Sequence, residues 1–172
     1  IEKVDLYSLL KAVSELIKNT LEAKKLKLIM KVYPNLPPYI FSDPIRLRQI
    51  LINLIGNAIK FTEKGEIEIE VRLISENELR QEAQIFFSVR DTGIGVSKEN
   101  QSSIFEAFSQ ADSSINRKYG GTGLGLPIAN KLLALMSSKL EIKSEYEKET
   151  IFYFTIDVKL EKHTMTQEEK PF

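Results

Sequence analysis

Asparagine and lysine side chains recur at helical spacing in the middle of this chain. Asn53, Asn57 and Lys60 are three or four positions apart, so a helix would project them from one side. An amide oxygen suits Mg²⁺, and an amine can pair with a phosphate oxygen. A buried amide without a partner costs about 1–3 kcal/mol, which favours a bound ligand. A solvated polar edge of an amphipathic helix is the alternative, and this helix alone leaves both open.

Two glycine-containing stretches could complete a site. The first reads DTGIG over residues 91–95. Its carboxylate can accept hydrogen bonds from an exocyclic amine, and its glycines let the backbone approach a flat ligand, although a structural turn has the same pattern. The second reads GGTGLGL over residues 120–126. Running into a helix, it would present free N–H groups and a positive helix end to a phosphate, unless it is a flexible hinge.

Familiar nucleotide-binding motifs fit neither stretch. A Walker motif needs a lysine after its last glycine, and Leu126 follows Gly125 instead. A dinucleotide fingerprint places its glycines after the first strand of a βαβ unit, whereas these glycines come late in the chain. The pattern therefore favours a nucleotide site of another kind.

The composition excludes several classes of protein. The 172 residues fit one domain, and the 24 basic and 24 acidic residues cancel, so no net field attracts nucleic acid. Cysteine is absent, which excludes disulfides and thiolate metal sites. No apolar run approaches the ~18 residues of a membrane span, and no signal peptide is present. We expect a cytoplasmic domain without direct membrane contact. Because the chain begins at Ile1, we expect a segment of a longer protein whose membrane anchor could lie elsewhere.

Periodicity predicts the elements that position these groups. Apolar residues from Leu6 to Leu21, Leu16 among them, mark an amphipathic helix over 4–25. Asp43 can cap a central helix over 43–62, and Pro44 fits its first turn. The core stripe of that helix is Leu47, Ile50, Leu51, Leu54, Ala58 and Phe61. The other expected elements are strands 26–32, 66–74, 83–90, 140–142 and 151–160, a short segment 39–41, a polar turn 75–81, a short helix after Ser97, a polar lid 109–119 and a helix 126–136.

This order of elements lacks strict βαβ alternation. It favours an α+β fold, a two-layer sandwich with helices on one face of a mixed, mostly antiparallel sheet. Residues 1–160 are expected to form one domain, and residues 161–172 a polar C-terminal tail or linker.

Four motifs together resemble the ATP-binding catalytic domain of sensor histidine kinases, in the superfamily shared with gyrase, Hsp90 and MutL. NLIGNAIKF (53–61) resembles the N box, and DTGIG (91–95) the first glycine box. IFEAF (104–108) resembles the F box, and GTGLGL (121–126) the second glycine box. The motifs follow the order and spacing of the family, and the resemblance covers residues 4–160. It implies a Bergerat-type ATP site beneath a flexible lid.

The resemblance implies a role for each matching residue. Asp91 would accept from the adenine amino group, with Gly93 and Gly95 shaping the pocket. Asn57 would ligate Mg²⁺, with Asn53 beside it on the same face.

Other implied contacts concern the phosphates and the lid. Lys60 would approach the phosphates of ATP. The remaining implied ATP-binding residues are Arg117, Lys118, Tyr119, Gly121, Thr122, Gly123, Leu124 and Gly125. Phe105 and Phe108 would anchor the lid by packing.

The chain departs from the family pattern at three places. Ser137-Ser138 stand where paired glycines are frequent, and residues 147–152 read EKETIF where a glycine-rich stretch is usual. Pro127 stands near the start of a helix, where a small helix former is commoner. No site is transferred to these positions.

Asn53 favours phosphoryl transfer over hydrolysis. In the ATPases of the superfamily a glutamate four residues before the metal asparagine activates water, and an asparagine cannot act as a general base. The resemblance therefore implies a protein histidine kinase that passes the γ-phosphate to a histidine elsewhere. The only histidine here, His163, lies in the polar tail without the acidic neighbour expected of a phosphoacceptor.

The expected partners follow from this reading. They are a helical dimerisation and phosphoacceptor domain of the same protein, and a downstream response regulator or fused receiver domain in two-component signalling. Two alternatives stay open: a hydrolytic ATPase of the same superfamily, and a non-catalytic nucleotide-binding module with a decayed pocket.

Overall fold

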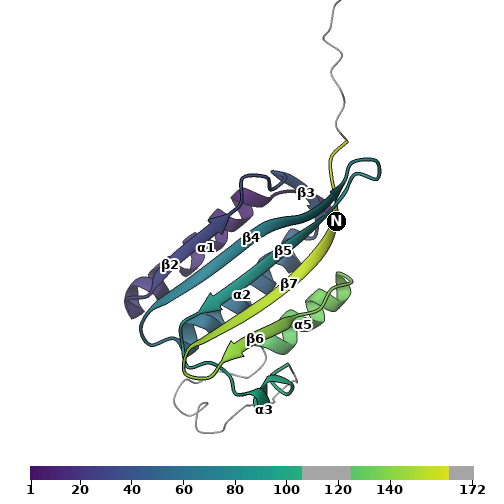
Figure 1. Ribbon diagram of the computed structural model, residues 1–172. Coiled ribbons are helices and arrows are strands. Elements are labelled where there is room, and N and C mark those ends of the chain that lie inside the picture. Colours follow the sequence, from purple (N-terminus) through teal and green to yellow (C-terminus); the bar gives the residue numbers. More distant parts are fainter. Residues whose placement is uncertain (106–124, 163–172) are drawn as a thin grey trace, which may run out of the picture.

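The computed structural model describes residues 1–105 and 125–162 (Figure 1). Its elements are β1 (Glu2–Asp5), α1 (Leu6–Lys24), β2 (Lys27–Val32), β3 (Tyr39–Ser42), α2 (Pro44–Phe61), β4 (Glu66–Asn77), β5 (Glu82–Asp91), α3 (Lys98–Gln101), α5 (Gly125–Leu135), β6 (Glu141–Glu145) and β7 (Glu149–Lys159). Within these residues seven strands form one sheet in the order β1-β3-β7-β5-β4-β2, and β6 pairs with β7 outside that path. β2 and β4 run parallel and the other described pairs are antiparallel. The predicted α+β fold with a mixed, mostly antiparallel sheet is confirmed.

One face of the sheet carries the core. Helices α1, α2 and α5 lie behind the sheet in the view of Figure 1, and they cover the face to which every second strand residue points. The alternating apolar residues of the three long strands are buried there: Ile67, Ile69, Val71, Ile85, Phe87, Val89, Phe152, Phe154, Ile156 and Val158. The rings of Phe87 and Phe154 stack with centroids 5.0 Å apart. The opposite face is charged and half-exposed, as is usual for an antiparallel sheet with one solvated side.

Helix α2 forms as its sequence predicts. Asp43 Oδ1 accepts a hydrogen bond from Arg46 N at 3.0 Å, and Pro44 occupies the first turn, where its missing N–H costs nothing. The core stripe from Leu47 to Ala58 is buried. Phe61 is only half-buried, because it ends the helix beside the following turn.

The start of the chain differs from the prediction. Glu2–Asp5 pairs with β3 as an edge strand, so the first helix begins at Leu6 rather than at residue 4. Asp5 Oδ1 then accepts from Ser8 N at 3.0 Å and caps that helix. Leu16 is 64% exposed although it was expected in the core, because it lies on the solvent side of α1.

Two other boundaries are corrected. β4 continues to Asn77 with a register shift between Leu73 and Ser75, so the turn expected over 75–81 is shorter. The short helix after Ser97 spans only Lys98–Gln101. Phe108, the lid expected over 109–119 and residues 163–172 lie outside the described residues. None of the helices in the described part of the chain is long and apolar enough to cross a membrane.

In the described part of the chain, four residues other than glycine adopt left-handed backbone conformations: Lys25, Gln81, Ser137 and Glu147. The last two lie in turns near the end of the chain. Ser137 has φ 57° just after α5, and Glu147 has φ 62° in the turn between β6 and β7. These are the positions where the family pattern places glycines. An L side chain in this conformation costs about 1–2 kcal/mol, so both turns keep the expected shape under strain.

Replacing Glu147 with glycine should raise the free energy of unfolding by about 0.5–1 kcal/mol, because glycine adopts a positive φ without steric cost. Lys148→Gly is the matched control, since Lys148 is exposed in the same turn and is not among the residues with positive φ. Glycine there should lower stability, because it adds freedom to the unfolded chain and removes the exposed ion pair between Lys148 and Glu145. Urea unfolding measures both variants, and equal effects would contradict strain at Glu147.

Candidate functional site

The polar stripe of α2 lies at the border between core and solvent. Asn53, Asn57 and Lys60 are all half-buried, whereas the apolar positions between them are buried. Burial lowers the pKa of the Lys60 ammonium, whose nitrogen lies 5.0 Å from the centre of the Phe61 ring. The stripe is therefore neither a fully solvated edge nor part of the core.

Asp91 is a buried carboxylate at the end of β5. Its exposed fraction is 2%, and its neighbours across the sheet are Ile67 and Thr150. Gly93 N donates to Asp91 Oδ1 at 2.9 Å, across the tight turn that follows the strand. Burial raises the pKa of Asp91 to about 6, and the Gly93 hydrogen bond and the Thr62 hydroxyl oppose that rise. A carboxylate buried from water is stabilised by each hydrogen-bond donor it gains, so Asp91 is a candidate acceptor for a ligand N–H.

The turn after β5 is joined to the end of α2 through the backbone. Ile94 N donates to Phe61 O at 3.4 Å. A Cβ on Gly93 would lie 2.3 Å from the same Phe61 carbonyl oxygen and 2.8 Å from Asp91 Oδ1. Only glycine allows this approach, and the contact places the predicted DTGIG turn one helical turn beyond Asn57.

The other side of the turn is closed by the β6–β7 connection. Gly95 has φ 70°, and a Cβ there would lie 2.3 Å from Glu145 O. Glu147 N donates to Ile94 O at 2.6 Å, and Val96 N donates to Ser144 Oγ at 2.8 Å. Both predicted glycines are therefore required by close backbone contacts, in addition to any ligand.

Asn53 connects α2 to the start of α5. Its Nδ2 donates to Gly125 O at 3.3 Å, and Gly125 is the first residue of α5. Of the predicted ATP-binding residues in the second glycine stretch and the lid, only Gly125 is described. Arg117, Lys118, Tyr119, Gly121, Thr122, Gly123 and Leu124 lie outside the described residues.

Two hydroxyl groups near Asp91 were not predicted from the sequence. Thr62, which ends α2, is fully buried, and its Oγ1 lacks a hydrogen-bond partner of ordinary geometry among the described residues. Thr150 on β7 is 4% exposed and is the pairing partner of Asp91 on the adjacent strand β5, and its Oγ1 lies 2.9 Å from Ser144 Oγ. Thr62 follows the N-box-like motif directly, which was a usable signal. Thr150 lies in the stretch that departs from the family pattern, so no sequence signal identified it.

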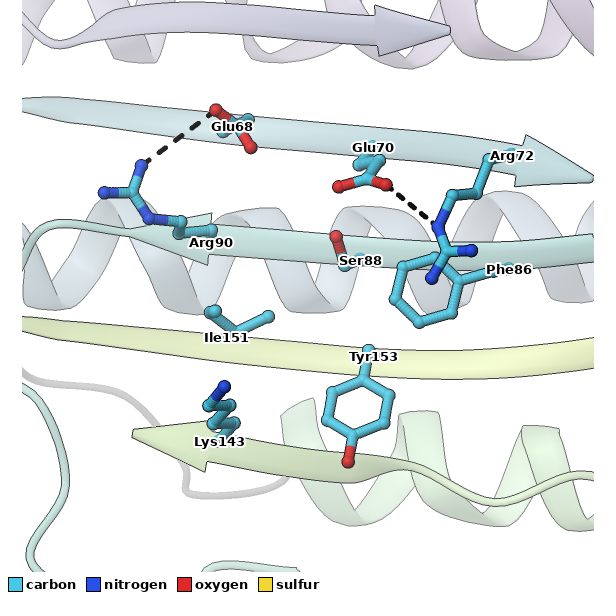
Figure 2. A pocket seen from close by; sticks show the side chains of 9 residues that line it. All are labelled: Glu68, Glu70, Arg72, Phe86, Ser88, Arg90, Lys143, Ile151 and Tyr153. Carbon is cyan, nitrogen blue, oxygen red and sulfur yellow. Dashed lines mark ion pairs between the residues drawn. The ribbon is translucent and has the colours of Figure 1, made fainter. Parts of the chain in front are cut away.

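A separate hollow of about 320 Å³ lies on the open face of the sheet (Figure 2). No predicted site residue is among those that line it. Four of its charged side chains form two ion pairs, Arg72 with Glu70 at 3.0 Å and Arg90 with Glu68 at 4.0 Å. This hollow belongs to the solvated face of the sheet and contains none of the side chains expected to bind a ligand.

Comparisons with known proteins point to one family. A family model described as histidine kinase-, DNA gyrase B-, and HSP90-like ATPase matches residues 42–160. The chain is 43% identical over 157 residues to the signal transduction histidine-protein kinase BarA of Escherichia coli (strain K12), covering 90% of this chain and 17% of that protein. It is 39% identical over 149 residues to the autoinducer 2 sensor kinase/phosphatase LuxQ of Vibrio cholerae serotype O1, covering 87% of this chain and 17% of that protein. The chain thus spans about a sixth of the length of these relatives.

Solved structures agree in fold. Full-length ShkA in complex with AMPPNP superposes with a TM-score of 0.79 at 34% identity, over 94% of this chain and 32% of that chain. The nucleotide-free catalytic domain of the histidine kinase ThkA gives a TM-score of 0.74 at 25% identity, over 90% of this chain and 93% of that chain.

The buried Asp91 should make stability depend on pH in the ligand-free protein. Its pKa of about 6 in the folded chain lies above the unfolded value, so stability from the neutral form is lost as pH rises through about 6. Asp91→Asn cannot ionise, so the variant does not lose this part of its free energy of unfolding as pH rises. The variant should match the wild type near pH 4 and exceed its free energy of unfolding by about 2 kcal/mol above pH 7. Urea unfolding across this range measures the difference, and a difference independent of pH would exclude Asp91 as its source.

Proposed function

We propose a phosphoryl-transfer function from the premise that the chain belongs to the family of histidine kinase-, DNA gyrase B- and HSP90-like ATPases, as a catalytic domain of the histidine kinase type. In this proposal the chain binds ATP with Mg²⁺ and donates the γ-phosphate to a histidine of a separate helical domain. The resemblance drawn from the four motifs is thereby confirmed at the level of the family. The nucleotide, the metal and the transfer are proposals.

The observation that carries the proposal is the buried Asp91 beside the end of α2. Gly93 N–H occupies Oδ1, and we assign the other carboxylate oxygen to the exocyclic amine of adenine. The glycine turn supplies a backbone surface for the flat base, since Gly93 and Gly95 allow close packing. A charge-assisted hydrogen bond in a site shielded from water would offset the free-energy cost of burying the carboxylate.

The same helix supplies groups for the triphosphate. No cluster of three histidine, cysteine or acidic residues that could hold a metal occurs in the described parts of the chain. An ion here would instead be held by the Asn57 amide oxygen, phosphate oxygens and water, a set that suits Mg²⁺. Bound Mg²⁺ would neutralise charge on the phosphates. Lys60, on the same stripe, is assigned to a phosphate oxygen.

In the proposed transfer this chain positions ATP and does no covalent chemistry. An imidazole nitrogen of the incoming histidine forms a bond to the γ-phosphorus. The bond from that phosphorus to the bridging oxygen breaks, and ADP leaves with the electron pair. Such a reaction needs mainly alignment and charge neutralisation. We further propose that the histidine-bearing domain belongs to the same longer cytoplasmic protein, and that a response regulator or fused receiver domain takes the phosphoryl group onward.

The Asn53 environment disfavours the hydrolytic alternative. Its amide is hydrogen-bonded to Gln49 and to Gly125 O, and an amide cannot take a proton from water near neutral pH. Steady phosphate release by the isolated domain would support hydrolysis instead, and absence of ATP affinity would support a non-catalytic module.

Asp91→Asn should weaken ATP binding by about 1–3 kcal/mol, because the amide either loses the charge-assisted bond or turns its own NH₂ toward the adenine amine. Isothermal calorimetry with ATP and Mg²⁺ measures the loss. Asp157→Asn, the same change at an exposed position on β7, is the matched control and should bind as the wild type does. Wild-type affinity in Asp91→Asn would remove the adenine assignment.

The chain alone should show negligible self-phosphorylation in radiolabelled ATP. Label should appear on the histidine of an added two-helix phosphoacceptor segment from the longer protein, because only that segment brings a nucleophile. Strong labelling of His163, or label that does not depend on the added segment, would overturn this part of the proposal.

A further inference from the structure

A relay of amide hydrogen bonds links the middle of α2 to the first turn of α5. Gln49 Nε2 donates to Asn53 Oδ1 at 2.7 Å, and Asn53 Nδ2 donates to Gly125 O at 3.3 Å. Gln49 is exposed, Asn53 is half-buried, and Gly125 is 72 positions further along the chain than Asn53. The relay therefore runs from the surface inward to a contact between two helices.

The direction of the relay fixes how the Asn53 amide is turned. The Gln49 side chain offers an N–H to the oxygen end of Asn53, which leaves the nitrogen end facing Gly125. The carbonyl of Gly125 can only accept, so the opposite orientation would set two oxygens against each other. The donor from Gln49 and the acceptor at Gly125 therefore favour the same orientation of the Asn53 amide.

This contact matters because of where α5 begins. Gly125 closes the second glycine motif, and α2 carries Asn57 one turn after Asn53. Holding the start of α5 against α2 keeps the two sides of the proposed nucleotide site at a constant separation. No Cβ added at Gly125 would meet a neighbour within 4 Å, so the backbone oxygen, and not the missing side chain, makes this contact.

We propose that Gln49 is a positioning residue for nucleotide binding, acting through the Asn53 amide to hold the first turn of α5 against α2 beside Asn57. This inference rests on the proposed function of the same site. A residue that touches no ligand thereby sets the affinity for ATP. The ordinary alternative is that Gln49 and Asn53 form an i,i+4 pair that supports α2 and nothing more.

Two substitutions at Gln49 separate these readings. Gln49→Glu replaces the donor with a carboxylate that can only accept, so it draws the Asn53 nitrogen toward itself and turns the oxygen toward Gly125. Gln49→Lys offers only donors and keeps the amide as it is. Gln49 is exposed to solvent, so both variants should fold with an unchanged midpoint of urea unfolding.

The expected result is an asymmetry between the two variants. Gln49→Glu should bind ATP·Mg²⁺ about five- to tenfold more weakly, the loss of one hydrogen bond, while Gln49→Lys stays within about twofold of the wild type. Arg48→Gln, at the neighbouring exposed position, changes the net charge by the same amount as Gln49→Glu and should leave affinity unchanged. In transfer assays the loss should appear in KM rather than in kcat.

A readout without nucleotide keeps this inference separate from the proposed function. The ¹³C shift of the Gly125 carbonyl should change in Gln49→Glu and not in Gln49→Lys, because only the former removes the bond from Asn53. Equal affinities and equal Gly125 shifts in the two variants would overturn the inference. Failure of the wild type to bind ATP would overturn the proposed function, while the Gly125 shift would still decide whether the relay exists.

Discussion

The backbone contact between the end of α2 and the turn after β5 is the constraint on which the rest of the site depends. Phe61 O accepts from Ile94 N, and Gly93 fits against the same oxygen only because it has no side chain. Since α2 is held by its apolar face and β5 by its two neighbours in the sheet, this contact places a helix stripe and a strand end at a fixed distance. The candidate site therefore depends on the contact between α2 and the turn after β5, and neither motif forms it alone.

Asp91 shows how stability and binding oppose each other at this junction. Its burial raises the pKa to about 6, so the ionised form costs the ligand-free protein some of its stability. The hydroxyl of Thr62 and the N–H of Gly93 offset only part of that cost. A fold tolerates such a group when a ligand restores its hydrogen bonds, which is why a buried carboxylate with a raised pKa in a tight turn suggests a binding role.

The features that could be predicted from the sequence are mainly those that rest on a repeating residue pattern. The inward residues of β4, β5 and β7 were predictable because alternation follows directly from strand geometry, and the stripe on α2 because helical spacing does. The turn at Asp91 was recognisable as a motif. β1 is too short to show a pattern, and Thr62 is a single hydroxyl whose meaning comes only from its burial near Asp91. Glu147 adopts a positive φ that its residue type disfavours, so no sequence rule would have placed it there.

The alternation of side chains along β5 determines which charged residue points toward the site. Val89 and Asp91 point toward the helices, while Arg90 points to the open face, where Glu149 and Glu66 accept from its guanidinium at 2.7 and 3.4 Å. A shift of one residue in the register would exchange them and place a cation among apolar side chains. The ion pairs of Arg90 on the solvated face and the apolar run before Asp91 both favour the observed register. The open face of the sheet therefore contributes to the site without touching it, by fixing the register that turns Asp91 inward.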